Sequence, residues 1–449
     1  MATDLERAFS ALSAKQAAYA KLWRYYDGDQ PLVYSTERLR EIFRHIDARF
    51  SENWCAVVID SMLDRVDLKD FTIANDKTAT LALNSLFEST GLQLDSYDAH
   101  LAALVTGEAF VVAWLDADNQ PAAYYNDPLL CHAFYDAENP HVMSFSAKWW
   151  EDEDEKRRVT LYYPDRLEYY VSKQKAENLS NATGLQPAET PTAPNPYGQI
   201  PVFHLRRERR TIKSELANVI SPQDAINKLV ADMMIAAEFG AAPQRYVISQ
   251  ADPGNLLNAP NANWWIPSGD GQGQQTQVGQ LLASDLGNYL KAIDHSAASL
   301  AIISRTPKHY LYQQGGDPSG EALIAMEAPL NKKCKRFTKV ASPVWRDVAA
   351  FLMRLADRPV DPYSITPEFE AVETVQPMTK AQVLQTNVAA GIPLRTALRD
   401  MGWTQEELAE MEQDKAEEQQ AAQDSLATAL ATQARNFDQG QRQGQVSNA

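Results

Sequence analysis

Apolar side chains recur at helical intervals from the start of the chain. Thr3 and Glu6 have the spacing of a capping box. The apolar positions that follow share one helical face: Leu5, Phe9, Leu12, Tyr19, Trp23 and Tyr26. Gly28 permits positive φ, and Pro31 cannot continue a helix. The pattern therefore predicts a first helix that ends near Tyr26.

The hydrophobic period changes at Ala109. Before it, an apolar stripe from Trp54 and two helical patterns that end beside Gly91 and Gly107 predict a helical region. After it, short runs of β-branched and aromatic residues predict an antiparallel meander and one later strand: residues 110–115, 142–150, 159–163, 167–171 and 201–205. Residues 172–199 contain four prolines and almost no large apolar side chain, so we expect a mobile loop or linker there.

Two later helical patterns enclose a segment that is not helical. Ser221 and Pro222 open a helix expected to run to about Ala242, and a second helix is expected from about Ser284 to Ser304. The enclosed segment holds a β-rich run, a tryptophan pair and a Gly/Gln tract: residues 246–248, 264–265 and 269–279. This order predicts an antiparallel two-helix arm with a small compact element at its tip.

The longest helical pattern follows a glycine-containing loop at residues 313–318. Ser319 is a suitable N-cap, and an apolar stripe from Leu323 to Leu355 predicts a helix of about ten turns. Pro329 and Pro343 each remove a hydrogen bond inside this helix, so we expect it to kink at one or both of them.

The chain ends in shorter helical patterns and a polar tail. Residues 377–402 and 404–434 have helical periodicity. Residues 436–449 are polar and contain little that is able to form a core, so we expect them to be disordered.

Composition excludes several classes of protein. A length of 449 residues allows roughly two to four domains. The formal net charge of −17 means that the chain as a whole repels phosphate, so contact with nucleic acid requires local patches. The three cysteines are far apart, which excludes a disulfide framework and favours a reducing compartment. We expect no membrane span, because no run of about 18 uncharged apolar residues occurs.

The sequence offers no positive support for an enzyme, so we expect no catalytic, cofactor-binding or metal site. The seven histidines show no metal-ligand spacing, and the chain has no phosphate-cradling GxxxxGK[ST] loop. Residues 151–155 are five consecutive acids, which is typical of a solvated loop tip. A hydrolase that uses some of the carboxylates stays an alternative, since paired catalytic carboxylates are recognised only by their separation in space.

One basic patch contrasts with the acidic background. Four basic side chains share one face of the predicted long helix: Lys332, Lys335, Arg336 and Lys339. They are candidate contacts to DNA phosphates, as charges that position a duplex without reading its bases. Pairing with acidic side chains of a neighbouring subunit explains the same pattern equally well.

Four segments carry a resemblance to a known family. Residues 25–32 (YYDGDQPL), 53–60 (NWCAVVID) and 64–66 (DRV) resemble the N-terminal signature of the SPP1-type portal family of tailed phages, particularly its actinobacterial phage members. Residues 319–323 (SGEAL) resemble the segment that follows the tunnel loop of that family. The resemblance covers nearly the whole chain, and it depends on the combination of segments with the order of elements.

The resemblance implies an α+β, predominantly helical portal fold, with neither catalysis nor a cofactor. Its expected parts are a wing (1–220), two stem helices (221–242 and 284–306), a clip (243–283), a tunnel loop with a long kinked helix and a return to the wing (307–378), and a crown (379–449). The tunnel loop would comprise five residues that face DNA: Gln313, Gln314, Gly315, Gly316 and Asp317. Tyr246, Trp264 and Trp265 would belong to the clip interface.

The same resemblance implies a ring of twelve identical subunits at one capsid vertex, made in the host cytoplasm and incorporated into the virion. Double-stranded DNA would pass through the ring during packaging and ejection. The expected protein partners are terminase, head-completion or adaptor proteins, the major capsid protein and the scaffolding protein, with no membrane involved. The alternative is a minor capsid or head-tail adaptor protein without a DNA channel.

Shortening the predicted tunnel loop by deleting Gln314 to Gly316 is expected to impair DNA packaging but not ring assembly, because a mobile loop contributes little to subunit contacts. DNA packaged into empty capsids and micrographs of the purified rings measure the two effects. A variant that never forms rings would contradict this interpretation.

Overall fold

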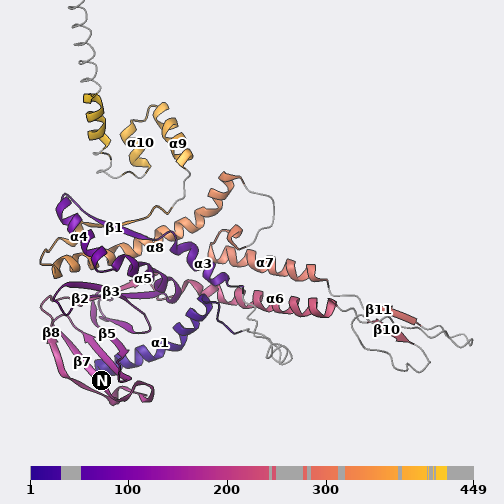
Figure 1. Ribbon diagram of the computed structural model, residues 1–449, viewed down its shortest axis with the longest axis horizontal. Coiled ribbons are helices and arrows are strands. Elements are labelled where there is room, and N and C mark those ends of the chain that lie inside the picture. The colour runs from indigo at the N-terminus through magenta and orange to yellow at the C-terminus, as the bar shows by residue number, and fades with distance from the viewer. Residues whose placement is uncertain are drawn as a thin grey trace, which may run out of the picture. The chain divides into compact units, whose positions relative to one another are not determined.

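The computed structural model describes residues 2–31, 52–241, 245–248, 277–280, 285–311, 319–372, 377–401, 403, 408 and 411–421. The chain divides into two compact units, Met1–Val372 and Glu373–Ala449 (Figure 1). Each unit is described by itself below.

Helix α1 (Asp4–Tyr26) opens the first unit as predicted. The Glu6 amide donates to Thr3 Oγ1 at 3.2 Å, and the Thr3 amide donates to Glu6 Oε2 at 2.8 Å. This capping box satisfies two amides that a helix start otherwise leaves unpaired. Gly28, with φ of +73°, follows the helix and turns the chain.

The three helices that the apolar pattern predicts follow α1: α3 (Trp54–Leu63), α4 (Lys77–Ser89) and α5 (Leu92–Thr106). A strand that the pattern did not predict, β1 (Leu68–Ile73), lies between α3 and α4. Asn53 caps α3 by accepting a hydrogen bond from the Ala56 amide at 3.2 Å. Gly107 ends α5 with φ of +101°, a conformation that glycine adopts without a steric penalty.

The predicted meander is divided between two antiparallel sheets. The larger sheet has the strand order β4-β5-β6-β7-β8: β4 (Cys131–Tyr135), β5 (Met143–Glu151), β6 (Lys156–Tyr162), β7 (Arg166–Lys175) and β8 (Leu185–Pro194). The smaller has the order β3-β2-β9: β2 (Glu108–Leu115), β3 (Pro121–Asn126) and β9 (Val202–Arg206). In the smaller sheet Phe110 pairs with His204, so a strand that returns from far along the chain completes it.

The prediction of a mobile loop or linker at residues 172–199 is wrong. Strand β7 extends to Lys175, the short helices η1 (Ala176–Asn178) and η2 (Ala182–Gly184) make the turn, and β8 pairs with β7. Pro187 lies opposite Tyr170 and Pro194 opposite Arg166. These prolines are tolerated because β8 is the edge strand, where a missing amide donor breaks no ladder.

Helix α8 (Gly320–Leu355) has the predicted length and start, since Ser319 Oγ accepts from the Ala322 amide at 3.3 Å. Both Pro329 and Pro343 lie inside this 36-residue helix, and the expected kink stays a prediction. The chain then passes η5 (Pro362–Ser364) and returns as β12 (Ile365–Phe369), which pairs antiparallel with β1. The main core lies between α8, α3 and α5, and the fully buried Trp345 belongs to it.

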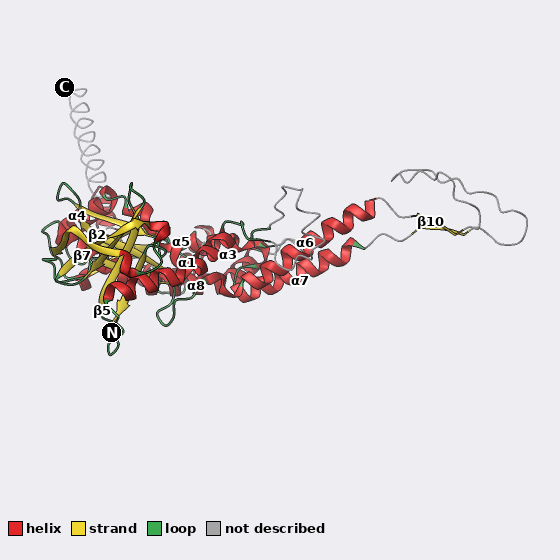
Figure 2. Ribbon diagram, turned by 90° about the horizontal axis from the view of Figure 1, so that it is seen from below, coloured by secondary structure: helices red, strands yellow, loops and turns green. Residues whose placement is uncertain are grey.

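The two-helix arm is present. It comprises η3 (Glu215–Asn218), α6 (Ile220–Ala241), β10 (Arg245–Ile248), β11 (Gln277–Gln280), α7 (Leu286–Ser304) and η4 (Lys308–Tyr310). Helices α6 and α7 lie side by side in both views (Figures 1 and 2). The predicted β-rich run is β10, and it pairs antiparallel with β11.

The second unit contains α9 (Pro377–Ala389), α10 (Leu394–Asp400) and a helical segment at residues 411–421. The helical pattern predicted for 377–402 is split, because Gly391 adopts φ of +88° and Pro393 starts the next helix. Residues 436–449 lie outside the described part of the chain.

The fold is α+β, as expected. Among the described residues, no helix is long and apolar enough to span a membrane.

Replacing Gly107 with alanine is expected to lower the free energy of unfolding by about 2 kcal/mol or more. A Cβ atom there would lie 2.7 Å from the backbone N and C of Lys213, and φ is +101°. Gly91→Ala is the matched control: φ is +71° with no atom near the added Cβ, so we expect a loss of about 1 kcal/mol. Chemical denaturation measures both losses, and equal losses would contradict the role of close backbone approach.

Candidate nucleic-acid interface

Helix α8 presents an exposed basic face. Lys332, Lys335, Arg336 and Lys339 are all exposed. The opposite face is fully buried in the core and includes Cys334, Phe337 and Trp345. The buried face fixes the rotation of the helix, so the four basic side chains are directed to the surface together. This arrangement suits contact with an anionic partner.

Local partners are defined for Lys333 and Arg346, two further basic residues of the same run. Lys333 Nζ lies 2.5 Å from Glu215 Oε1 and donates to the Ser304 carbonyl at 2.6 Å. Arg346 Nη2 lies 3.0 Å from Asp347 Oδ1. The Arg346 guanidinium also lies 4.8 Å from the centre of the Tyr363 ring. Lys333 therefore joins α8 to η3 and α7, rather than extending the exposed face.

A cleft of about 1120 Å³ lies between β9 and α8, and we call it the basic cleft. Five basic side chains line it: Arg206, Arg209, Arg336, Lys339 and Arg346. Asp347 is the one carboxylate among its lining residues. Arg206 and Arg209 lie at the end of β9 and just after it, whereas the other three lie on α8. Positive charge therefore approaches the hollow from two sides.

A second, smaller hollow of about 240 Å³ adjoins the same helix and shares Arg336 with the basic cleft. Lys332, Lys213 and Arg305 line it, and so do Glu208 and Glu215. Arg207 and Lys333 line it as well, so six basic side chains face two carboxylates and this hollow is also strongly basic. The exposed basic face of α8 divides accordingly, because Lys339 faces the basic cleft and Lys332 faces the smaller hollow.

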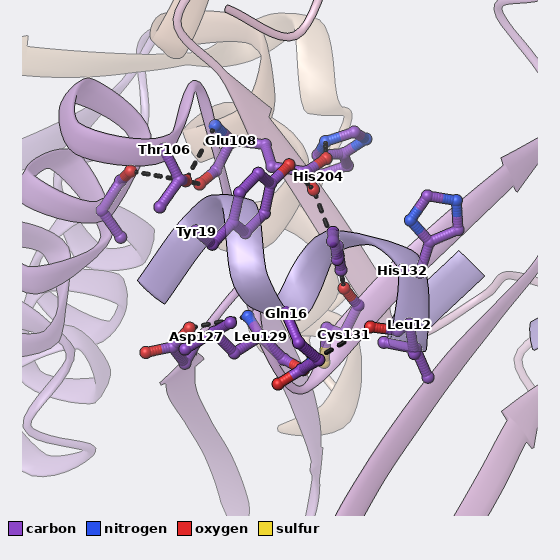
Figure 3. Close-up of polar contacts among 12 residues, drawn as sticks. Leu12, Gln16, Tyr19, Thr106, Glu108, Asp127, Leu129, Cys131, His132 and His204 are labelled. Carbon is purple, nitrogen blue, oxygen red and sulfur yellow. Dashed lines mark hydrogen bonds and ion pairs between the residues drawn. The ribbon is translucent and has the colours of Figure 1, made fainter. Parts of the chain in front are cut away.

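A buried polar cluster supports the wall of the basic cleft (Figure 3). Glu108, at the start of β2, accepts from Lys15 Nζ at 3.1 Å and from the Tyr19 hydroxyl at 2.7 Å. Its other carboxylate oxygen lies 2.9 Å from His204 Nε2. His204 Nδ1 lies 2.9 Å from the Tyr135 hydroxyl. Lys15 also donates to the carbonyl of Cys131. The cluster thus joins α1, β2, β4 and β9.

Burial and charge pairing compete in this cluster. Burial works to raise the pKa of Glu108, but hydrogen bonding and charge from His204 and Lys15 outweigh it and lower that pKa to about 2. Burial lowers the pKa of Lys15 and the pKa of His204, although Glu108 opposes both shifts. Burial also lowers the pKa of His132 to about 4. Glu108 is therefore the charged centre on which the cluster depends.

Sequence reasoning missed this cluster. A usable signal was present, because Glu108 and His204 interrupt runs of apolar strand residues, and a charged group inside such a run usually has a buried partner. The identity of the partner was not readable, since Lys15 lies 93 residues away from Glu108.

The proposed tunnel-loop residues, Gln313 to Asp317, lie outside the described part of the chain, and so do Trp264 and Trp265. Tyr246 lies on β10.

A polar contact joins the elements on either side of the loop. Arg65 Nη2 donates to the Tyr310 hydroxyl at 2.7 Å and lies 3.7 Å from Glu327 Oε2. This contact links η4 and α8 to the end of α3.

Among the described residues, no group of three or more histidine, cysteine or acidic side chains is arranged to hold a metal ion. Cys131 is fully buried, and burial raises the pKa of its thiol to about 12. Cys131 therefore lacks the thiolate character of a nucleophile.

Comparisons with known proteins point to one family. The family model described as phage portal protein, SPP1 Gp6-like, matches residues 11–424. The portal protein of Mycobacterium phage L5 is 23% identical over 443 residues, covering 90% of this chain and 86% of the relative. The portal protein of Mycobacterium phage D29 is 23% identical over 390 residues, covering 79% of this chain and 76% of the relative.

Replacing Glu108 with glutamine is expected to lower the free energy of unfolding by about 3 kcal/mol at neutral pH, because Lys15 stays buried without its counter-charge. The pKa of Glu108 in the folded chain, about 2, lies below the ordinary value of 4.5. Its stabilising contribution is therefore complete above pH 4.5 and is lost as the pH falls towards 2.

Thermal unfolding between pH 2 and 7 tests this, with the exposed Glu88→Gln as the control, expected to change stability by less than about 0.5 kcal/mol. The Glu108→Gln curve should fall less steeply below pH 4.5 than that of the unaltered chain. Parallel curves would contradict the role assigned to Glu108.

Proposed function

The chain belongs to the SPP1 Gp6-like family of phage portal proteins, and we propose that its copies close head to tail into a ring of twelve around a channel for double-stranded DNA. The observation that carries this proposal is the extent of the match, which runs through both the sheet-containing body and the two-helix arm. The two mycobacterial phage relatives also match over most of their own length. A minor capsid or adaptor protein would not account for that match.

We assign the parts of the portal fold to segments of the chain by the order of the elements. Residues 1–220, with both larger sheets, form the wing, and α6 and α7 form the stem within 221–242 and 284–306. The clip is 243–283, and 307–378 provide the tunnel loop, the long helix and a return to the wing. Residues 379–449 form the crown. The pairing of β12 with β1 supports the return to the wing, and the side-by-side packing of α6 and α7 supports the stem.

The charge of the chain suits a channel through which DNA slides. Each copy contributes a formal charge of −17, so a ring repels phosphate over most of its surface. Tight binding would stall transport, whereas a few basic groups are able to steady the duplex through salt-sensitive contacts. We assign such contacts to Lys332 and Lys335, which lie on the exposed face of α8 outside the basic cleft. Gln313 to Asp317 would face the same DNA.

The proposed partners follow from membership of the portal family. The clip, with Tyr246, Trp264 and Trp265, would contact terminase during packaging and a head-completion or adaptor protein afterwards. The major capsid and scaffolding proteins would surround the wing, with the ring assembled in the host cytoplasm and retained in the virion. The ring itself would act as a passage and carry out no catalysis.

Electron microscopy of the purified protein, with rotational averaging, tests the ring directly. We expect particles with twelvefold symmetry and an axial hole wide enough for a duplex. Particles without any central opening would remove the proposal.

The double variant Lys332→Ala with Lys335→Ala is expected to weaken binding of duplex DNA to the ring at low salt. It should reduce the slope of log affinity against log salt concentration by up to about 2, because each phosphate contact contributes nearly one unit. Lys69→Ala with Lys77→Ala removes two other exposed lysines and is the control, with the slope unchanged. Equal slopes for both variants would contradict the assignment of Lys332 and Lys335.

A further inference from the structure

A second charged feature complements the basic cleft. Five acids, residues 151–155, form the end of β5 and its turn into β6, and we call this segment the acidic tip. Most of its side chains are exposed: the exposed fraction is 54% for Glu151, 77% for Asp154 and 64% for Glu155, whereas Asp152 is only 16% exposed. Glu153 is also exposed. The acidic tip therefore presents negative charge to solvent on a narrow two-stranded hairpin.

The conformation of the acidic tip is specified by its own residues. Asp152 Oδ1 accepts from the amides of Asp154 at 3.1 Å and Lys156 at 2.9 Å, which closes the turn. Glu155 has φ of +58°, a region that glycine and asparagine occupy more readily. A glutamate there costs roughly 1 kcal/mol relative to glycine. Glu155 therefore adds a fifth carboxylate to the acidic tip, although its positive φ is unfavourable for a glutamate.

The ion pairs of Asp154 and Glu155, at the end of the hairpin, are exchangeable. Arg157 lies 2.7 Å from Glu151, and Arg158 lies 2.7 Å from Asp152. Lys156 lies 3.8 Å from Asp154, and Lys175 contacts Glu155. The pairs of Asp154 and Glu155 lie at exposed positions, where an ion pair contributes between zero and about 1 kcal/mol, whereas the side chains of Asp152 and Arg157 are only 16% and 18% exposed. A stronger basic environment is therefore able to compete for the same carboxylates.

The acidic tip cannot reach the basic cleft of its own chain. Met143, at the start of β5, lines the cleft, and Glu151, at the other end of the same strand, begins the tip. A nine-residue strand places these two ends about 26 Å apart. One strand thus carries a wall of the basic cleft at one end and the acidic tip at the other.

We propose that in the ring the acidic tip of each subunit enters the basic cleft of the next subunit. This inference rests on the proposed ring. Head-to-tail closure requires two different surfaces that complement each other on every copy, and these two features have opposite charge. The carboxylates of the tip would meet Arg336 and Lys339 from α8 and Arg206 from β9.

The shape of the cleft favours a hairpin tip over a duplex as its occupant. Its basic groups come from two elements, α8 and the end of β9, so a narrow hairpin that enters the cleft meets basic side chains of both. A duplex carries its phosphates on the outside of a wide cylinder and would contact only the rim. Lys332, another exposed lysine of α8, lies outside the basic cleft.

Charge reversal tests this contact in the full-length chain. The cleft variant is Arg336→Glu with Lys339→Glu, and the tip variant is Glu153→Lys with Asp154→Lys. Each is expected to raise the protein concentration needed for half-maximal ring formation by at least about tenfold, since like charges then face each other. Combining all four substitutions should restore ring formation to within about threefold of the unaltered chain. Analytical ultracentrifugation at two salt concentrations measures the ring fraction.

The control is Glu88→Lys with Glu189→Lys, which changes the net charge as the tip variant does, at exposed positions on α4 and β8. Rings that form normally with this control support the proposal, and circular dichroism checks that every variant is folded. Cleft and tip variants that assemble like the unaltered chain, or a combination that restores nothing, would overturn it. An unaltered chain that forms no ring would remove the proposed function and this contact with it.

Discussion

Three elements from distant parts of the chain depend on one buried carboxylate. Glu108 of β2 holds Lys15 and Tyr19 of α1 and lies against His204 of β9. A carboxylate in apolar surroundings is unfavourable alone, and only a nearly complete set of partners makes it compatible with folding. Since β9 is an outer strand of its sheet and leads to Arg206, this cluster also sets where the wall of the basic cleft lies. The stability of the body and the shape of its charged surface therefore have a common origin.

The packing of helix α8 against the core decides which of its basic side chains reach the surface. Its buried face includes Phe337 and Trp345, and the Trp345 indole donates to His100 Nε2 at 2.8 Å, so the helix cannot rotate. With the rotation set, a shift of one position changes the role of a lysine. Lys332 is exposed, whereas Lys333 contacts the buried Glu215. The basic run thus contains both anchors of the fold and surface groups, and the position of each residue around the helix decides between the two roles.

A portal protein must hold its subunits together and still let DNA pass. In the proposed ring, the two requirements are met by distributing charge unevenly. The net charge of −17 disfavours retention of DNA, while five basic side chains are collected in one cleft. Positive charge enclosed between two walls is more accessible to a narrow protein segment than to a duplex. In that proposed ring, subunit cohesion and weak DNA contact would both involve helix α8.

The sequence by itself determined the features that arise from neighbours within a few residues. The capping box of Thr3 and Glu6, the helix ends beside Gly91 and Gly107, the paired arm helices and the length of α8 all follow from local periodicity and capping. Only the tertiary structure decided that residues 185–194 form an edge strand despite their prolines, because pairing with β7 supplies energy that local preference does not contain. The same holds for the partners of Glu108, since contacts between residues 93 positions apart are set by packing and not by spacing.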